Sequence, residues 1–427
     1  MDLIIYPGKL QGTNTAIPSK SQAHRLLICA AFSDAVTRLI CPEVNQDIEA
    51  TVQCLTALGA GIIHTEYGYL VTPVSTIPET VQMDCGESGS TLRFILPIVC
   101  ALGVDATIHM SGRLPYRPMS PLWEELERMG CKLTRPTEST IHSTGKLQAG
   151  EYVIPGNISS QFVSGLLFAL PLIKGESRIR VVGSLESEPY AIMTQKALSR
   201  FGVDTTDFRI TGSFPFHTPG SVKVEGDWSN AAFFLTATAL GSSITVDNLN
   251  PDSVQGDRAI MDILSGGNKH CTVSAANVPD LIPILSVYFA AGDGAVFTDI
   301  GRLRLKESDR VVSVCNMLNS LGIRTKSDEK TLTVYGGKFT AGVVNTYADH
   351  RIAMAAAIAA TVAEGPVVIQ GAECVAKSYP AFWREFRSLG GSYEQYIRRV
   401  SEAFHLWSIP RVRNRNDFRR YSGRTAG

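Results

Sequence analysis

Ile17-Pro-Ser-Lys-Ser-Gln-Ala-His-Arg25 is a short polar stretch that precedes an apolar run. Pro18 and Ser19 predict a helix start, because proline tolerates the first helical turn and a serine oxygen can cap free backbone N–H groups. Such a start carries a partial positive charge, to which Lys20 and Arg25 add two full charges. The stretch therefore suits an anionic ligand, although a single copy more often marks an ordinary capped helix with solvated basic residues.

The same arrangement, a polar stretch before an unusually apolar helix, recurs along the chain. The further copies are Gly86-Glu-Ser-Gly-Ser-Thr-Leu-Arg93, Gly156-Asn-Ile-Ser-Ser-Gln-Phe162, Gly226-Asp-Trp-Ser-Asn-Ala231, Asn277-Val-Pro-Asp-Leu281 and Asn345-Thr-Tyr-Ala-Asp-His-Arg351. Successive marker residues are 69, 71, 70, 50 and 70 positions apart, the markers being Ser19, Ser88, Ser159, Ser229, Pro279 and Asp349. A period this regular predicts repeated structural units.

Each unit also carries a second predicted helix that ends close to a glycine, a common C-terminal signal. These second helices are expected at 47–58, 118–129, 188–201, 258–264, 308–321 and 380–389. Short β-rich runs separate the helices, for example 61–64, 152–154, 178–182, 243–246 and 332–335. The first helices are apolar on nearly all faces, which predicts that they are buried. We therefore expect an α/β fold of two lobes, each built from three repeats of a small α/β unit around buried parallel helices.

Composition narrows the class of protein. The 427 residues are 44% apolar and 19% charged, which is ordinary for a soluble globular protein. The formal net charge is zero, and the longest apolar stretches are too short to span a bilayer, so neither nucleic acid nor a membrane is an expected partner. Nine scattered cysteines without a Cys-x-x-Cys pair argue against zinc and disulfides. With no signal or transit peptide at the start, we expect a cytoplasmic protein.

Basic residues cluster near the predicted helix starts. If the starts of the two lobes face each other, the cleft gathers Lys20, Arg25, Arg93, Arg117, Lys306, Arg310, Arg351 and Lys377. So many cations cannot face one another without anions, which predicts ligands with several phosphate or carboxylate groups.

These residues closely resemble those of the 5-enolpyruvylshikimate-3-phosphate (EPSP) synthase family, over about residues 7–391. The matches are Lys20-Ser21 with Arg25, Gly89-Ser90 with Arg93, Arg117-Pro118, Ser159-Ser160-Gln161, Ser187 with Tyr190, Asp280, Lys306-Glu307-Ser-Asp-Arg310, Asp349-His350-Arg351 and Lys377. Each match alone is a weak pattern. Together they occur in the same order as in the family and at the spacing of the repeat, which makes the resemblance specific.

The resemblance implies the two-lobed enolpyruvyl transferase fold, in which the N-terminal strand belongs to the C-terminal lobe. The expected division is an N-terminal lobe at 17–224, a C-terminal lobe at 1–16 with 225–395, and a basic tail at 396–427. It also implies transfer of the enolpyruvyl group of phosphoenolpyruvate to the 5-hydroxyl of shikimate 3-phosphate, with release of phosphate. No metal or organic cofactor is expected, and we expect a monomer.

The resemblance also implies roles for individual residues. Addition and elimination need two carboxylates with different proton roles. Asp280 is expected to be the base near the 5-hydroxyl and Glu307 the proton donor, and Lys20 could share either role. Phosphoenolpyruvate is expected to contact Lys20, Gly89, Arg117, Gln161, Arg310, Arg351 and Lys377. Shikimate 3-phosphate is expected to contact Lys20, Ser21, Arg25, Ser159, Ser160, Gln161, Ser187, Tyr190, Asp280 and Lys306.

Other residues near these motifs receive structural interpretations. Arg93 is expected to be an ion-pair partner within its lobe, Asp47 the cap of the first unit's second helix, and His350 a support for its neighbour. Two positions depart from the family pattern. Arg302 stands where many members have an asparagine that contacts the shikimate ligand, so we assign it no contact. Glu188 stands where a basic residue is common.

Two competing functions remain open. The related transferase that acts on UDP-N-acetylglucosamine has a cysteine in a loop that here, at 111–120, contains none. A non-catalytic polyanion-binding repeat protein would account for the tail, which has eight arginines against Glu402 and Asp417. Asp280 and Glu307 disfavour that second reading, because acids would repel a polyanion.

Overall fold

A computed structural model describes residues 1–212 and 215–396. Apart from Tyr396, the predicted basic tail lies outside the described residues. Within the described ranges, no helix has both the length and the apolar character needed to cross a bilayer.

Six buried α-helices begin one to three residues from the markers of the sequence repeat. They are α1 (Lys20–Ala31), α3 (Gly89–Leu102), α5 (Ser160–Ala169), α7 (Trp228–Ala239), α9 (Ile282–Ala290) and α11 (His350–Ala360). The second helices of the units are α2 (Gln46–Ala57), α4 (Leu122–Arg128), α6 (Glu188–Arg200), α8 (Ile260–Ser265), α10 (Arg310–Ser320) and α12 (Phe382–Ser388). Helix α4 begins four residues later than predicted, because Pro118 and Pro121 disfavour helical backbone in the residues before them.

Six sheets accompany these helices in the described part of the chain, and four of them have four strands and share one pattern of strand directions. In each of the four, a parallel pair is extended by two antiparallel strands. The first-lobe sheets comprise β13 (Ser221–Lys223), β3 (Thr37–Ile40), β5 (Gly68–Thr72) and β4 (Gly61–Thr65); β6 (Thr80–Asp84), β7 (Asp105–His109), β9 (Thr140–Gly145) and β8 (Cys131–Thr137); and β10 (Glu151–Pro155), β11 (Glu176–Val182) and β12 (Arg209–Thr211). The second-lobe sheets comprise β14 (Ser243–Asp247) and β2 (Gln11–Thr15); β15 (Cys271–Ser274), β16 (Gly294–Thr298), β18 (Leu332–Tyr335) and β17 (Thr325–Ser327); and β19 (Gly342–Asn345), β20 (Val367–Gln370), β1 (Asp2–Tyr6) and β21 (Ser392–Gln395).

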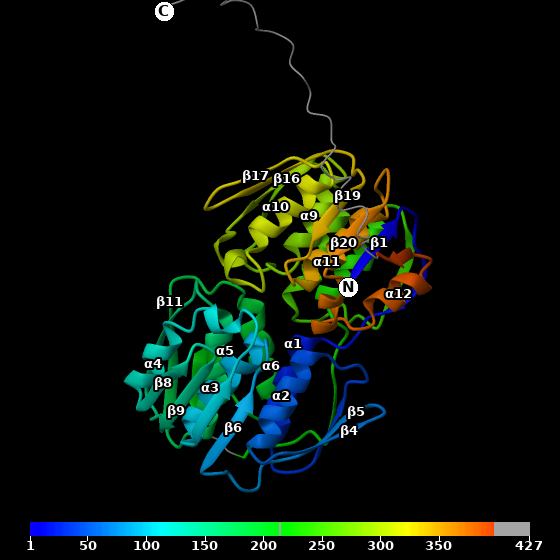
Figure 1. The fold of residues 1–427 in the computed structure, drawn as a ribbon. Coiled ribbons are helices and arrows are strands. Elements are labelled where there is room, and N and C mark those ends of the chain that lie inside the picture. The colour runs from blue at the N-terminus through cyan, green and yellow to red at the C-terminus, as the bar shows by residue number, and fades with distance from the viewer. Residues whose placement is uncertain (213–214, 397–427) are drawn as a thin grey trace, which may run out of the picture.

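The buried side chains form two separate hydrophobic cores, which Figure 1 shows as two lobes. The first core draws on residues between Ala23 and Val224 and surrounds α1, α3 and α5. The second core surrounds α7, α9 and α11, and it includes Leu3, Ile5, Leu10 and Ile17 from the start of the chain. The chain therefore begins in the second lobe, builds the first, and returns.

The two passages between the lobes lie side by side. Ser19 N donates a hydrogen bond to Glu225 O at 2.8 Å, and Asp227 N donates to Ile17 O at 2.7 Å. Pro18 and Gly226 form an antiparallel bridge between these bonds. Helices α1 and α7 begin directly after the two passages, so both present their N-terminal turns at the junction of the lobes.

Candidate active site

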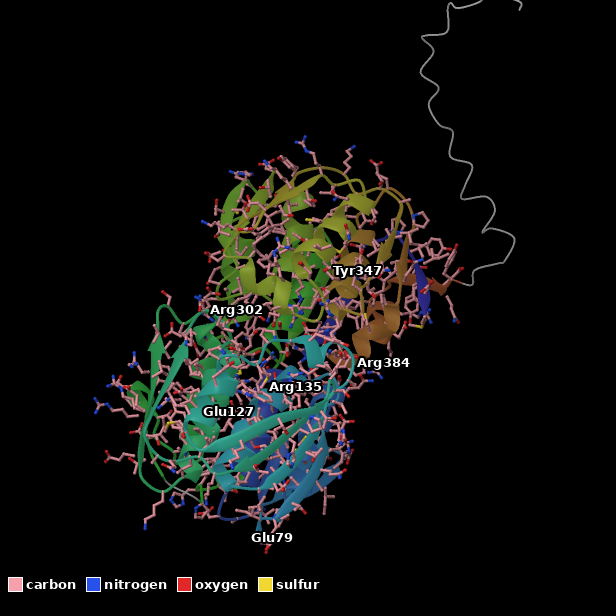
Figure 2. The ribbon with its side chains drawn as sticks, turned by 60° about the vertical axis from the view of Figure 1, so that its left-hand side comes forward. Glu79, Glu127, Arg135, Arg302, Tyr347 and Arg384 are labelled. Carbon is pink, nitrogen blue, oxygen red and sulfur yellow. The ribbon has the colours of Figure 1, made fainter. Side chains whose placement is uncertain are left out.

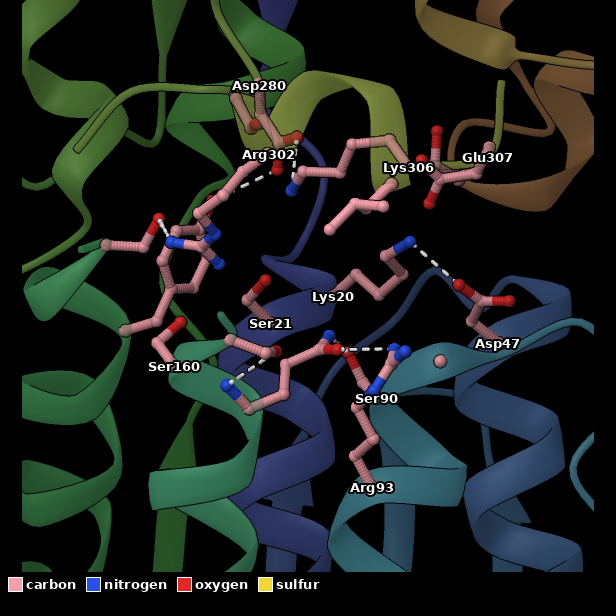
Figure 3. A pocket seen from close by; sticks show the side chains of 18 of the residues that line it. Lys20, Ser21, Asp47, Ser90, Arg93, Ser160, Asp280, Arg302, Lys306 and Glu307 are labelled. Atoms are coloured by element: carbon pink, nitrogen blue, oxygen red, sulfur yellow. Dashed lines mark hydrogen bonds and ion pairs between the residues drawn. The ribbon is translucent and has the colours of Figure 1, made fainter. Parts of the chain in front are cut away.

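A pocket at the junction of the lobes collects the starts of the buried helices (Figure 3). Ser88, Ser159, Asp227 and Asp349 cap α3, α5, α7 and α11 with their side-chain oxygens. The pocket is lined by Lys20, Ser21, Arg25, Gly89, Arg117, Ser159, Ser160, Gln161, Ser187, Tyr190, Asp280, Lys306, Glu307, Arg310 and Arg351. These are all of the predicted site residues except Lys377, which lines an adjoining pocket with Glu87.

Arg310 is the centre of an ion-pair cluster on the second-lobe side. Its side chain is only 1% exposed and contacts three carboxylates. Its Nη2 lies 2.7 Å from Glu307 Oε2, its Nε lies 2.9 Å from Asp349 Oδ2, and its Nη1 contacts Asp280 Oδ1. One buried guanidinium thus fixes the positions of both candidate acid–base carboxylates.

Asp280 receives hydrogen bonds from both lobes. Lys306 Nζ and Arg351 Nη2 each lie 3.3 Å from its carboxylate, and the Tyr190 hydroxyl of the first lobe donates to Oδ2 at 3.1 Å. Burial opposes ionisation of Asp280, but Arg351, Lys306 and Arg310 together hold its pKa well below the usual range. Asp280 is therefore a carboxylate when no ligand is bound.

Glu307 is in a similar electrostatic environment. Burial again opposes ionisation, but Arg310, Arg117 and Lys377 hold its pKa well below the usual range. In the ligand-free protein, both candidate carboxylates are therefore ionised. For one of the two carboxylates to act as an acid, its pKa must rise when ligands bind. Bound anions would raise it, because they offset the charge of the nearby cations.

Two site lysines have acid partners that the sequence did not indicate. Lys20 Nζ lies 2.8 Å from Asp47 Oδ2, and Lys377 Nζ lies 2.9 Å from Glu87 Oε2 across the lobes. Figure 3 shows the pair of Lys20 and Asp47 facing the pocket. The prediction that Asp47 caps its helix is wrong, because the side chain of Asn45 accepts the bond from Ile48 N and caps α2 instead.

Three arginines on the first-lobe side, the buried Arg25 and Arg93 and the half-buried Arg117, have no carboxylate within ion-pair distance among the described residues. Arg25 donates to Thr194 Oγ1 at 2.8 Å, Ser21 O at 2.6 Å and Tyr190 O at 2.9 Å. Burial lowers its pKa to about 10. A buried guanidinium whose hydrogen-bond acceptors are all neutral oxygens is well suited to bind an anion.

Arg93 and Arg117 lie over the start of α3. Arg93 donates to Gln161 Oε1 and to Pro118 O, each at 2.9 Å, so the ion pair predicted for it is not seen in the part of the chain that the structure describes. The Nε atoms of both arginines are buried without a partner. A Cβ on Gly89 would lie 2.5 Å from Arg117 Nη1, so glycine leaves room for this guanidinium.

Sequence reasoning missed several residues of the pocket. Asp227, Ser229 and Asn230, at the start of α7, line it, and Asp227 accepts a hydrogen bond from Lys20 N at 3.2 Å. Nearby Asp257 is buried, and burial together with the charge of Asp280 raises its pKa to about 7. The polar start of α7, Gly226-Asp-Trp-Ser-Asn-Ala231, was visible as a repeat copy, but nothing in its sequence marked it as functional.

The fold is similar to that of known enolpyruvyl transferases. An EPSP synthase from Acinetobacter baumannii superposes with a TM-score of 0.75 at 23% identity, covering 92% of this chain and 100% of that one. The enolpyruvyl transferase NikO from Streptomyces tendae gives a TM-score of 0.73 at 17% identity, covering 93% and 99%. The predicted two-lobed α/β fold is confirmed, and it is the fold that these enolpyruvyl transferases share.

Sequence comparison identifies the particular family. The family model described as EPSP synthase (3-phosphoshikimate 1-carboxyvinyltransferase) matches residues 5–275 and 265–386. A 3-phosphoshikimate 1-carboxyvinyltransferase from Clostridium beijerinckii is 38% identical over 432 residues, covering 92% of this chain and 99% of the relative. One from Clostridioides difficile is 36% identical over 431 residues, covering 92% and 98%. The chain belongs to the EPSP synthase family.

Proposed function

We propose that this protein transfers the enolpyruvyl group of phosphoenolpyruvate to the 5-hydroxyl of shikimate 3-phosphate and releases phosphate, as a step of aromatic amino acid biosynthesis. Membership of the EPSP synthase family supports the reaction. We assign the reaction to this pocket because two carboxylates, Asp280 and Glu307, are both paired with the buried Arg310. Such a pair supplies acid–base groups inside an otherwise cationic pocket.

Phosphoenolpyruvate is assigned to the cationic side of the pocket next to Glu307. Its carboxylate and phosphate would contact Lys20, Gly89, Arg117, Gln161, Arg310, Arg351 and Lys377. Arg117 supports this assignment, because its buried Nε has no partner and no carboxylate of the described residues lies within ion-pair distance of it. The Gln161 amide is fixed in position on the same side of the pocket. Its oxygen accepts a hydrogen bond from Arg93, and its nitrogen donates one to the Ser90 hydroxyl, each at 2.9 Å.

Shikimate 3-phosphate is assigned to the side of the pocket formed by α1, α5 and α6. Its contacts would be Lys20, Ser21, Arg25, Ser159, Ser160, Gln161, Ser187, Tyr190, Asp280 and Lys306. Arg25 supports this placement, because it is buried and its hydrogen-bond acceptors are all neutral oxygens. Tyr190 and Asp280 are already hydrogen-bonded to each other across the lobes, which brings the carboxylate to the first-lobe side.

The proposed chemistry moves one proton in each direction. In the addition, the 5-hydroxyl oxygen of shikimate 3-phosphate bonds to the phosphate-bearing carbon of phosphoenolpyruvate, and Asp280 accepts the hydroxyl proton. Glu307 donates a proton to the methylene carbon of phosphoenolpyruvate. In the elimination, the resulting methyl group returns a proton to Glu307 as the bond from carbon to the phosphate oxygen breaks, and the departing phosphate takes up the proton that Asp280 releases. Anionic phosphoenolpyruvate raises the pKa of Glu307 by offsetting Arg117, Arg310 and Lys377, so binding itself prepares the proton donor. Lys20, close to the same pocket, could share either role.

A phosphate-release assay tests the proposal. With phosphoenolpyruvate, we expect release in the presence of shikimate 3-phosphate, no release with UDP-N-acetylglucosamine, and for an Asp280→Ala control a release with shikimate 3-phosphate that is about 10²- to 10⁴-fold slower. Release with the nucleotide sugar alone would identify the related transferase. No release with either acceptor, from protein that binds both anions, would favour a non-catalytic polyanion-binding protein.

The proposal extends to cellular and molecular organisation. All nine cysteines are free in the structure, which suits the reducing cytoplasm to which we assign the protein. We propose that it acts as a monomer with lobes at 17–224 and at 1–16 with 225–395, since both cores and the pocket between them come from one chain.

A further inference from the structure

Arg117, which we assign to phosphoenolpyruvate, stands on a loop rather than on a helix. The loop leads from the end of β7 at His109 to α4, and Arg117 directly follows its 3₁₀ helix η1 (Leu114–Tyr116). The N–H groups of Leu114, Tyr116 and Arg117 bond to carbonyls of the loop itself, at 3.1 Å each. These bonds shape the turn but do not fix it to the rest of the lobe, so the position of Arg117 depends on what supports the loop.

The hairpin formed by β8 and β9 supplies that support. Arg135, on β8, donates a hydrogen bond from Nη1 to Pro115 O at 3.0 Å, and its guanidinium lies 5.9 Å from the centre of the Trp123 ring, within cation–π range. Figure 2 shows Arg135 in the first lobe, near the junction with the second. At the turn of the hairpin, Glu138 Oε2 accepts a hydrogen bond from the Tyr116 hydroxyl at 3.1 Å. Two consecutive loop residues are thus bonded to side chains of one hairpin.

The backbone of the hairpin explains why Arg135 reaches the loop. Strands β8 and β9 are antiparallel, and their register shifts between Thr134 and Thr137, so Arg135 lies in an irregular stretch of β8. Such irregularities redirect a side chain from the face that regular alternation would give it. The hairpin also contacts the beginning of the loop, because Met110 N donates to Ser139 O at 2.8 Å.

The group that depends on this support is the Arg117 guanidinium. Its Nη1 lies so close to the start of α3 that a Cβ on Gly89 would be 2.5 Å away. Its Nε is buried without a partner, and no carboxylate of the described residues lies within ion-pair distance of it. The side chain therefore has no acidic partner to hold it, and a displacement of the loop by about 1 Å would move the charge away from a bound anion.

We propose that Arg135 is a positioning residue that holds Arg117 in place for phosphoenolpyruvate. The inference rests on the proposed function and adds to it a residue outside the pocket of the helix starts. Arg135 is absent from the lining of that pocket, and lines instead a separate pocket together with Pro115, Arg117 and Trp123. Without Arg135, phosphoenolpyruvate would have to restrict the loop when it binds, which lowers affinity and leaves the chemical step unchanged.

The test compares Arg135→Met with the matched control Lys132→Met. Both variants remove one positive charge from β8, but Lys132 is exposed and has no hydrogen bond or ion pair among the described residues. We expect Arg135→Met to raise the KM for phosphoenolpyruvate about tenfold, the combined size of a charged hydrogen bond and a cation–π contact at an exposed site. Its kcat at saturation and its affinity for shikimate 3-phosphate, measured by calorimetry, should stay within about twofold of the wild type. Lys132→Met should match the wild type in every measurement.

Two further variants separate positioning from a general structural role. Arg135→Lys should restore part of the affinity, because an ammonium group can still donate to Pro115 O. In an Arg117→Gln background, Arg135→Met should raise the KM by less than about twofold, because it acts through Arg117.

Three results would overturn the inference alone, in a protein whose wild type turns over both substrates. They are an unchanged KM in Arg135→Met, an equal loss of affinity for shikimate 3-phosphate, and a full further rise of the KM in the Arg117→Gln background. A wild type that releases no phosphate from phosphoenolpyruvate with shikimate 3-phosphate would overturn the proposed function as well.

Discussion

Arg310 shows how a single side chain can set the chemistry of a site. It is almost wholly buried, and its three nitrogens are each directed at a different carboxylate. Asp349, which caps α11, is the structural member of this set, whereas Asp280 and Glu307 face the pocket. Removing one partner from such a network leaves a buried charge uncompensated, so substitutions should preserve shape and hydrogen bonding where they can.

We expect Asp280→Ala and Glu307→Gln to lower turnover by about 10²- to 10⁴-fold, the usual cost of losing an acid–base group. Dissociation constants for the anionic substrates should change little or improve, because each variant removes negative charge from a cationic pocket. In Glu307→Gln, solvent exchange of the phosphoenolpyruvate methylene hydrogens, followed by NMR, should fall together with turnover. If Glu307→Gln keeps normal exchange of the methylene hydrogens and only binds the substrates weakly, Glu307 is not the proton donor and Lys20 becomes the better candidate.

The pH dependence of binding should reflect Lys306. Burial lowers the pKa of Lys306 to about 8 in spite of the attraction of Asp280, so the free protein loses this charge as the pH rises through about 8. Affinity for shikimate 3-phosphate should therefore fall by up to about tenfold per pH unit above that value, since binding must restore one proton. Calorimetry between pH 7 and pH 9.5 measures this slope. Lys306→Gln should bind weakly with a flat profile, and a slope retained in that variant would assign the titration to another group.

The sequence could predict the residue types of the site but not their pairings. The cations and the two carboxylates were recognisable from their motifs, and they line one pocket or its neighbour. Asp47, the partner of Lys20, lies 27 residues away on the second helix of the same unit, and Glu87 pairs with Lys377 across the lobes, at separations that no local pattern reports. Arg302 was similarly left without a role, because its contact with Ser187 exists only when the two lobes meet.

At the scale of the element, the starts of the buried helices are the functional units. The starts of α3, α5, α7 and α11 combine a side-chain cap with residues that line the pocket, and the repeat brings such starts from both lobes to one junction. A buried network reinforces the first lobe: His24 Nδ1 contacts Thr51 Oγ1 at 2.7 Å, which contacts Thr91 Oγ1 at 2.7 Å. Burial lowers the pKa of His24 to about 3, so this imidazole stays neutral and links α1, α2 and α3.

The start of α3 can be tested with one added carbon. In Gly89→Ala, the new Cβ would lie 2.5 Å from Arg117 Nη1 and 2.7 Å from Arg93 Nη1, so the guanidiniums must move. We expect the KM for phosphoenolpyruvate to rise by about tenfold or more, with little change in shikimate 3-phosphate affinity, because a charge-assisted contact is displaced. Gly8→Ala is the control, since a Cβ there meets nothing within 4 Å. Equal losses for both substrates would mean that the helix start itself is disrupted.

At the scale of the whole molecule, the repeat made the fold predictable. Marker spacing predicted the six buried helices to within three residues, and the predicted β-rich runs coincide with β4, β10, β11, β14 and β18. Where a predicted helix boundary was wrong, local residues explain the difference. Helix α4, for example, starts later than predicted because of two prolines. The pairing of β1 with β20 and β21 could not be derived from periodicity, because it joins residues from opposite ends of the described chain.

Ligands should draw the lobes together. The proposed contacts are divided between the lobes, and the unpaired charges of Arg25, Arg93 and Arg117 face further cations across the pocket. We expect small-angle scattering to show a smaller radius of gyration with shikimate 3-phosphate and glyphosate than without ligand, because bound anions remove this repulsion. Shikimate, which lacks the phosphate, serves as the control and should give a smaller change. An unchanged radius with both anions would contradict closure.

The paired passages between the lobes also determine what kind of motion closure can be. A single connecting strand would act as a swivel and let the lobes rotate freely about it. Two antiparallel chain segments, joined by the bonds from Ser19 to Glu225 and from Asp227 to Ile17, resist that twist and leave bending as the main degree of freedom. We therefore expect closure to be a bending motion about this pair of segments, which returns Ser187 to Ala276 and Tyr190 to Asp280 in the same register.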